Sequence, residues 1–203
     1  MQEVVDQFNI VYYESQVWAG GTHWMGYEIL KTPTDMWTYQ EIIFQTRPDV
    51  IIECGTYKGA SALFFANLFD IMGNGQVITM DILEQKNLPK HPRIKYMVGD
   101  TLKLVAPARL MTSGKRVMVI LDSDHSKNHV FNEMQTYGPL VTPGCYMIVE
   151  DTNIHGHPVR PNEPEGPYEA VEAYMQLRND FAIDKSREKF LLTSNPNGYL
   201  LKK

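Results

Sequence analysis

Short apolar runs alternate along the chain with stretches in which apolar residues recur every three or four positions. The first pattern predicts buried strands and the second predicts amphipathic helices. The predicted strands span residues 50–53, 76–80, 94–98, 117–121 and 145–149. The predicted helices span residues 34–46, with Thr34 as the N-cap, and 59–72, 101–111, 128–137 and 167–178. Strands and helices that alternate in this way predict an α/β fold with a parallel sheet and helices on both faces.

The two ends of the chain depart from this alternation. Near the C-terminus, the apolar segments 190–193 and 199–201 flank Asn195-Pro196-Asn197-Gly198, and the Asn-Gly pair predicts an antiparallel hairpin. The first 30 residues carry scattered aromatic residues that could cover a bound molecule, form a contact between subunits, or simply pack. We therefore expect residues 1–33 to form an N-terminal cap segment and residues 34–203 to form one domain.

Composition narrows the class of protein. A chain of 203 residues that is 43% hydrophobic can build one core and is short for two. The net charge is −5 and no run of Lys or Arg occurs, which argues against nucleic acid or an anionic membrane as partner. The chain shows no transmembrane stretch and no signal peptide, so a cytoplasmic location is expected. Cys54 and Cys145 lie in apolar strand-like segments, which predicts buried reduced thiols.

A glycine-containing loop follows the first predicted strand. In Glu53-Cys54-Gly55-Thr56-Tyr57-Lys58-Gly59, Gly55 would allow a sharp turn and Gly59 would let the next helix pack close to the sheet. Dinucleotide sites have Gly-x-Gly-x-x-Gly here, with a phosphate at the helix N-terminus. The acid ahead of Gly55 and the longer spacing favour a cofactor with an ammonium group, S-adenosylmethionine. A plain strand-to-helix turn with incidental glycines is the alternative.

Acidic residues close most of the predicted strands. In open α/β sheets the ligand lies beyond the carboxyl ends of the strands, so these acids are candidates for ligand contacts. Asp81 follows Gly55 by 26 residues, close to the offset at which a carboxylate accepts ribose hydroxyls. Asp100 could reach the adenine side of the cofactor or could be the N-cap of the next helix.

A denser group of acids follows the fourth and fifth strands. Asp122 and Asp124 come after residues 117–121, and Glu150 and Asp151 come after 145–149. Carboxylates that converge repel one another, so such a group usually binds a cation. Oxygen ligands select a hard ion, and an open site favours Mg²⁺. We predict Asp122, Glu150 and Asp151 as metal ligands and Asp124 as a reserve ligand or cofactor contact; helix caps and solvated charges are the alternative.

His125 stands three residues after Asp122. Imidazole titrates near neutrality and can take a proton from a hydroxyl whose acidity a metal has raised. We predict that His125 is the general base, that the resulting alkoxide attacks the sulfonium methyl group, and that much of the rate comes from holding the two reactants together. A capping or core histidine is the alternative, and His129 could orient the base.

At these residues the chain resembles the cephalosporin hydroxylase and rhamnosyl O-methyltransferase family, which is similar to the catalytic domains of macrolide sugar O-methyltransferases. The resemblance covers about residues 20–201. Its matching segments are Trp24-Met25-Gly26, Lys31-Thr32-Pro33, residues 52–61, Leu121-Asp122-Ser123-Asp124-His125, Glu150-Asp151-Thr152 and residues 192–200.

The resemblance implies a Rossmann-like class I methyltransferase fold with a mostly parallel seven-stranded sheet and a C-terminal antiparallel hairpin. It implies metal binding by Asp122, Glu150 and Asp151 and a base at His125. Cofactor contacts would fall on Glu53, Gly55, Ser61 and Asp81, to which we add Thr56, Asp100 and Asp124. A homo-oligomer is also expected from the relatives.

The function predicted from the sequence is S-adenosylmethionine-dependent, Mg²⁺-assisted O-methylation of a sugar or another small natural product. A component of β-lactam hydroxylation or methoxylation and a non-catalytic cofactor-binding subunit remain alternatives, and the loop spacing disfavours a nicotinamide dehydrogenase. No His-x-Asp or His-x-Glu occurs, which disfavours an iron oxygenase. We expect acceptor choice to lie in residues 155–167, where His155 and His157 either touch substrate or belong to a rigid surface loop.

Overall fold

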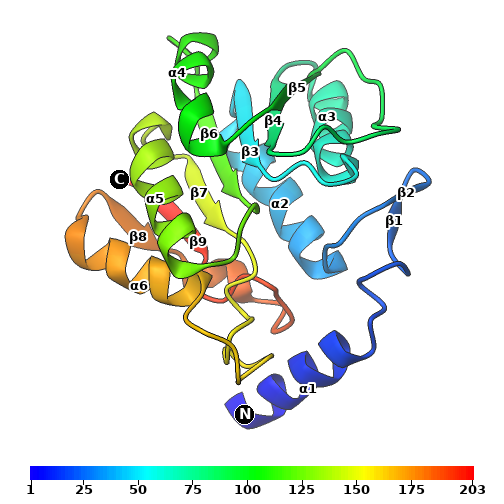
Figure 1. Cartoon of the computed structure of the whole chain (residues 1–203), viewed down its shortest axis with the longest axis vertical. Coiled ribbons are helices and arrows are strands. Elements are labelled where there is room, and N and C mark those ends of the chain that lie inside the picture. Colours follow the sequence, from blue (N-terminus) through cyan, green and yellow to red (C-terminus); the bar gives the residue numbers. More distant parts are fainter.

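A seven-stranded sheet forms the centre of the protein in a computed structural model that describes residues 1–203 (Figure 1). Its strands are β3 (Val50–Cys54), β4 (Gln76–Asp81), β5 (Ile94–Val98), β6 (Val117–Leu121), β7 (Tyr146–Val149), β8 (Phe181–Ile183) and β9 (Tyr199–Lys202). The order across the sheet is β5-β4-β3-β6-β7-β9-β8. Strands β3 to β7 are parallel, and β9 runs antiparallel to both β7 and β8. The predicted fold class is confirmed.

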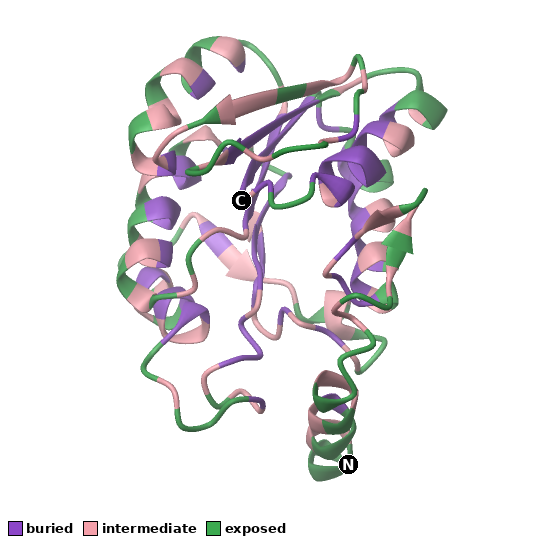
Figure 2. Ribbon diagram, turned by 45° about the vertical axis from the view of Figure 1, so that its right-hand side comes forward, coloured by how far each residue is buried: buried purple, intermediate pink, exposed green.

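Helices cover both faces of this sheet, as the edge-on view in Figure 2 shows. They are α2 (Pro33–Thr46), α3 (Ala60–Met72), α4 (Thr101–Met111), α5 (Lys127–Tyr137) and α6 (Pro167–Leu177), with short 3₁₀ turns η1 (Gly138–Leu140) and η2 (Lys185–Glu188). Helix α5 packs between α4 and α6 on one face, and α2 packs beside α3 on the other. All residues of β3, β6 and β7 are buried, because helices close off both faces of the central strands.

The register of the central strands positions the acids. Leu121 at the end of β6 pairs with Cys54 on one side and with Val149 on the other. The residues that follow these strand ends therefore emerge at the same edge of the sheet. This register brings Asp122 and Glu150 together although they are far apart in the sequence.

Two local predictions near the active edge were wrong. The N-cap of α2 is Thr32, not Thr34, because Pro33 occupies the first helical position and the Thr32 hydroxyl accepts the backbone N–H of Asp35 at 3.2 Å. The predicted strand at 190–193 is absent, and the partner of β9 is β8. Thr193 and Ser194 instead direct their polar groups to Asp35, so this segment adds no strand to the sheet.

The N-terminal segment contains α1 (Gln2–Glu14) and a two-stranded ribbon, β1 (His23–Trp24) with β2 (Tyr27–Glu28). Helix α1 projects at one end of the molecule and about half of its residues are exposed (Figure 2). It is joined to the body by the buried Asn9, whose amide donates to the Leu191 carbonyl oxygen at 3.1 Å. The ribbon packs on α3, where Trp24 contacts Phe64 edge to face and donates to Asn67 at 2.9 Å. None of the helices combines the length and the apolar character that a membrane span requires.

Candidate active site

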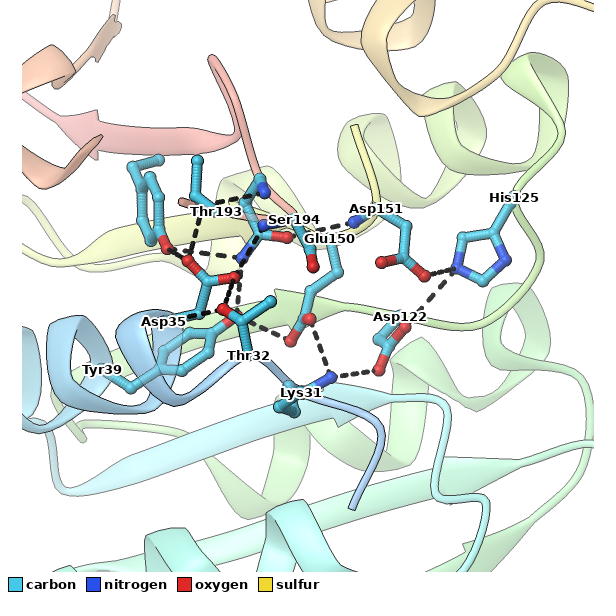
Figure 3. A network of polar contacts seen from close by, with 12 residues as sticks. Lys31, Thr32, Asp35, Tyr39, Asp122, His125, Glu150, Asp151, Thr193 and Ser194 are labelled. Atoms are coloured by element: carbon cyan, nitrogen blue, oxygen red, sulfur yellow. Dashed lines mark hydrogen bonds and ion pairs between the residues drawn. The ribbon is translucent and has the colours of Figure 1, made fainter. Parts of the chain in front are cut away.

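The acids that follow β6 and β7 meet around a buried lysine (Figure 3). Lys31 Nζ lies 2.6 Å from Asp122 Oδ2 and 2.7 Å from Glu150 Oε2. Lys31 is 6% exposed. It immediately precedes Thr32, the N-cap of α2, so the start of this helix fixes the position of the Lys31 backbone beside the acids. The sequence predictions assigned no role to this residue.

His125 lies on the open side of the same acids. Its Nε2 atom is 3.0 Å from Asp151 Oδ2 and 3.5 Å from Asp122 Oδ1. Ligand atoms of these three residues lie within 4.8 Å of one another, which is a spacing that could hold a metal ion. Nε2 is buried and makes no well-aligned hydrogen bond, since the close carboxylate oxygens lie off its N–H direction.

Glu150 and Asp151 are adjacent in sequence but differ in surroundings. Glu150 is 2% exposed, and its two oxygens contact Lys31 and the Tyr39 hydroxyl, which donates to Oε1 at 2.7 Å. The Asp151 side chain is 32% exposed, and its backbone has a left-handed φ of 55°. Two of the predicted metal ligands, Asp122 and Asp151, therefore lie beside His125. The third, Glu150, lies further inside the protein, in contact with Lys31 and Tyr39.

The charges of this cluster are strongly coupled. Burial raises the pKa of Glu150 to about 8, and Asp122 and Asp151 act in the same direction while Lys31 opposes them. Burial lowers the pKa of Lys31, but Asp122 and Glu150 outweigh this effect and hold the pKa well above its usual value. Burial also lowers the pKa of His125, but the Asp122 and Asp151 carboxylates raise it to about 11. Without another cation, the lysine and the histidine therefore both carry positive charge.

Two cavities flank the segment that follows β6. The larger has a volume of about 480 Å³ and is lined by Gly55, Tyr57, Met80, Asp81, Ile82, Gln85, Asp100, Thr101, Asp122, Ser123, Asp124 and His129. The smaller has a volume of about 190 Å³, and its lining includes Trp18, Lys31, Thr56, Ser61, His125 and Asp151. Gly55 and Asp122 border both cavities, whereas His125 and Asp151 line only the smaller one. The open part of the acid cluster therefore faces the smaller cavity, and Asp122 lies in the wall shared with the larger one.

Gly55 forms part of the wall that separates these cavities. Its φ is 102°, and a Cβ atom at this position would lie 1.7 Å from the Asp122 carbonyl oxygen. A side chain would have to push the two strand ends apart. This requirement explains why the loop after β3 needs glycine at this position.

Besides Gly55, three of the predicted cofactor residues line the larger cavity. Asp81 accepts the backbone N–H of Tyr57 and of Leu83, each at 2.9 Å. Asp100 caps α4 by accepting the Leu102 N–H at 3.0 Å, so its capping role is real even though it also faces the cavity. Asp124 accepts the Ser126 N–H at 2.8 Å at the opposite wall.

The remaining predicted cofactor residues lie elsewhere around the loop. Thr56 and Ser61 line the smaller cavity. Glu53 lines neither cavity, is fully buried, and accepts the Thr79 hydroxyl at 2.6 Å, while its Oε1 has no partner. Burial raises the pKa of Glu53 to about 7, although the Ser61 and Thr79 hydroxyls and Lys31 oppose this rise.

The loop 155–167 does not supply histidines to these cavities. His155 contacts the Pro164 carbonyl oxygen, and His157 lies 2.6 Å from Glu169 and stacks on Tyr168. After Asp151, which lines the smaller cavity, Asn153 lines a small crevice that Asp151 also borders.

The sequence analysis also missed residues that bond to the acids of the site, either directly or through one another. They are Tyr39, Asn195, Asp35 and Lys31. For Lys31 and Asn195 a signal was present, because Lys31-Thr32-Pro33 and residues 192–200 belong to the segments that resemble the family. Asp35 and Tyr39 lie outside those segments. Neither segment contains a group whose chemistry shows that it lies beside the acids, so only their position in the fold identifies them.

Comparison with known proteins identifies the family of this chain. The model of the family described as rhamnosyl O-methyltransferase/CmcI matches residues 16–203. Rhamnosyl O-methyltransferases from Mycobacterium tuberculosis and Mycobacterium leprae are 38% and 40% identical to this chain, and each alignment covers 98% of it. The alignments cover 85% and 91% of these relatives, respectively.

Solved structures show the same fold. A structure of CmcI with Mg and SAM has a TM-score of 0.68 at 25% identity and covers 90% of this chain and 76% of CmcI. MycE, a methyltransferase solved with Mg, SAH and mycinamycin VI, has a TM-score of 0.55 at 18% identity; 83% of this chain and 45% of MycE are covered. The family match and the identity to the mycobacterial proteins show that this chain belongs to the rhamnosyl O-methyltransferase/CmcI family.

Proposed function

We propose that this protein transfers the methyl group of S-adenosylmethionine to a hydroxyl group of a sugar or another small natural product. In this proposal Asp122, Glu150 and Asp151 hold Mg²⁺ and His125 is the general base. The observation that carries the proposal is that Asp122 borders both cavities while His125 and Asp151 line the smaller one. These residues can act on an acceptor in the smaller cavity next to a cofactor in the larger one. The rhamnosyl O-methyltransferase relatives support the same activity.

The residues present fit a hard divalent cation. Asp122 and Asp151 offer carboxylate oxygens that lie within 4.8 Å of each other at the smaller cavity. His125 Nε2, a buried atom without a well-aligned hydrogen bond, is left for the acceptor hydroxyl. Glu150 Oε2 contacts the ammonium group of Lys31 at 2.7 Å, so Glu150 would bind the ion by exchanging this contact for one to the metal. Mg²⁺ bound by these acids would increase the acidity of an acceptor hydroxyl.

His125 must lose its proton before it can act as a base. The two carboxylates raise its pKa to about 11, and a cation that shares them would weaken this effect and lower the pKa. Neutral His125 then takes the hydroxyl proton at Nε2. The acceptor oxygen forms a bond to the methyl carbon as the sulfur–carbon bond breaks, leaving S-adenosylhomocysteine and a protonated histidine.

The larger cavity is the proposed cofactor site. Asp81 would accept the ribose hydroxyls at the end of β4, and Asp100 and Asp124 would complete the opposite walls. Gly55, Thr56 and Ser61 lie on the loop after β3 and the start of α3, and they line the smaller cavity. Glu53 precedes this loop, and we keep it among the proposed cofactor residues for that reason. The smaller cavity, which contains Trp18 and His125, would receive the acceptor.

Calorimetry tests cofactor and ion before the acceptor is known. S-adenosylmethionine is titrated into metal-free protein, and Mg²⁺ is then titrated into the complex. We expect both to bind, and we expect EDTA to abolish methylation of rhamnoside acceptors. If the cofactor does not bind, the methyltransferase proposal is wrong. If the cofactor binds without ion uptake, or if EDTA leaves turnover unchanged, the metal assignment is wrong.

A further inference from the structure

Two segments without a role in the proposed chemistry meet beside the acid cluster, on the side away from His125 (Figure 3). One is the start of α2, and the other is the loop that precedes β9. They are joined by Asp35, which is 2% exposed and accepts four hydrogen bonds. The donors are the Thr32, Thr193 and Tyr199 hydroxyls and the backbone N–H of Ser194, at 2.5–2.8 Å.

From this joint, one amide side chain reaches both acids that follow β7. Asn195 Oδ1 accepts the backbone N–H of Asp151 at 3.1 Å. Asn195 Nδ2 donates to the Tyr39 hydroxyl at 3.3 Å, and that hydroxyl donates to Glu150 Oε1 at 2.7 Å. Tyr39 and Asn195 are 1% and 0% exposed, so water does not compete for these bonds.

This connection meets a geometric need of the site. Consecutive residues of a strand point to opposite faces, so an extended backbone would separate the carboxylates of Glu150 and Asp151. The left-handed φ of 55° at Asp151 breaks this alternation. A strained conformation of this kind persists only where its surroundings hold it. The Asn195 amide stabilises this conformation by accepting the Asp151 N–H, and the Tyr39 hydroxyl stabilises the neighbouring Glu150 carboxylate.

We propose that Tyr39 and Asn195 are positioning residues that aim Glu150 and Asp151 at a common cation. Tyr39 fixes the direction of the Glu150 carboxylate, and Asn195 secures the backbone turn that points Asp151 toward His125. Neither residue lines either of the two cavities. The proposal rests on the proposed function, because it assigns these residues to the metal site of that function. Their role resembles that of outer groups around other metal sites, whose loss lowers metal affinity about 10–100-fold.

Tyr39→Phe tests the proposal, because it removes only the hydroxyl group. Mg²⁺ affinity, measured by calorimetry on the full chain, should fall about 10–100-fold while S-adenosylmethionine affinity stays within about twofold of wild type. Tyr137→Phe is the matched control. It removes the hydroxyl of another fully buried tyrosine, which donates to the Thr101 carbonyl oxygen away from the acids, and should leave Mg²⁺ affinity unchanged.

Asn195→Ala provides a second, independent variant. It should also weaken Mg²⁺ binding, and the electron paramagnetic resonance spectrum of Mn²⁺ bound in place of Mg²⁺ should change in both variants but not in Tyr137→Phe. Wild-type Mg²⁺ affinity and an unaltered Mn²⁺ spectrum in Tyr39→Phe and Asn195→Ala would show that both residues are merely structural. If wild-type protein binds S-adenosylmethionine but no Mg²⁺, the metal assignment itself is wrong and the positioning proposal is rejected with it.

Discussion

The acid cluster has two halves that differ in burial and in hydrogen bonding. The buried half consists of Lys31, Tyr39, Glu150 and Asn195, each at most 6% exposed, and none of its side-chain polar atoms lacks a partner. The open half consists of Asp122, His125 and Asp151, whose side chains are 22–33% exposed. Its histidine has a buried Nε2 atom without a well-aligned hydrogen bond.

The two halves of the acid cluster therefore differ in how freely their contacts can change. A buried polar network in which every member is bonded is held in one arrangement, because each broken bond would leave an unpaired group in a medium of low dielectric constant. The open half can exchange its internal contacts for contacts with a ligand. We infer that the buried half sets the geometry and the open half carries out the chemistry.

The largest expected effect comes from removing the base in the open half. His125→Ala should lower turnover about 10²–10⁴-fold, because general-base catalysis contributes about this much. S-adenosylmethionine affinity should stay near wild type. His91→Ala is the control, since that histidine pairs with Asp70 and lines neither cavity. Collapse of cofactor affinity in His125→Ala would show that the base assignment is wrong.

The next effect comes from removing the acid of the buried half. Glu150→Ala should weaken Mg²⁺ binding by about 100-fold or more and abolish the Mg²⁺ dependence of turnover, because it leaves Lys31 without one of its two partners and the cation without a ligand. Calorimetry with Mg²⁺ measures this loss. Glu165→Ala, in an exposed acid paired with Lys127, is the control. Equal Mg²⁺ affinity in both variants would remove Glu150 from the site.

Glu53 sharpens the comparison, because it is as buried as Glu150 but contacts no lysine. Its folded-state pKa of about 7 exceeds the ordinary value of 4.5, so the folded protein binds the extra proton and stability falls as pH rises from about 4.5 to about 7. This rise in pKa corresponds to about 3 kcal/mol. Glu53→Gln should therefore be more stable than wild type at pH 8 by up to about that amount.

Urea unfolding at pH 5 and pH 8 measures the effect of Glu53→Gln. The gain in unfolding free energy should be small at pH 5 and large at pH 8. A gain that is the same at both values would show that the Glu53 carboxyl carries no extra proton in the folded state.

The smallest expected effect is a proton released on metal binding. At pH 9 Glu150 is ionised, because its pKa is about 8, whereas His125 with a pKa of about 11 still holds its proton. A cation that shares the His125 carboxylates should release about one proton, so Mg²⁺ affinity should rise about tenfold per pH unit near pH 9. Calorimetry in two buffers of different ionisation enthalpy counts this proton. If His125→Ala releases as many protons on Mg²⁺ binding as wild type does, the proton comes from another group.

The fold was largely predictable because its signal is local. Five strands and five helices follow from hydrophobic periodicity, and their observed bounds differ from the predicted ones by at most one residue. The predicted C-terminal antiparallel pair is confirmed, but its first strand is β8 and not residues 190–193. The polar residues of the 190–194 segment bond instead to Asp35, far away in the sequence, which no local signal reveals.

The sequence by itself determined the α/β class, the glycine loop and the residues that end each strand, because each depends on neighbours within about one turn or one strand. The tertiary structure alone decided which of the acids is buried, that Lys31 lies between two of them, and that Tyr39 and Asn195 support them. The Tyr39–Glu150 and Tyr39–Asn195 contacts span 111 and 156 residues. Such contacts depend on sheet register and helix packing, which no local pattern encodes.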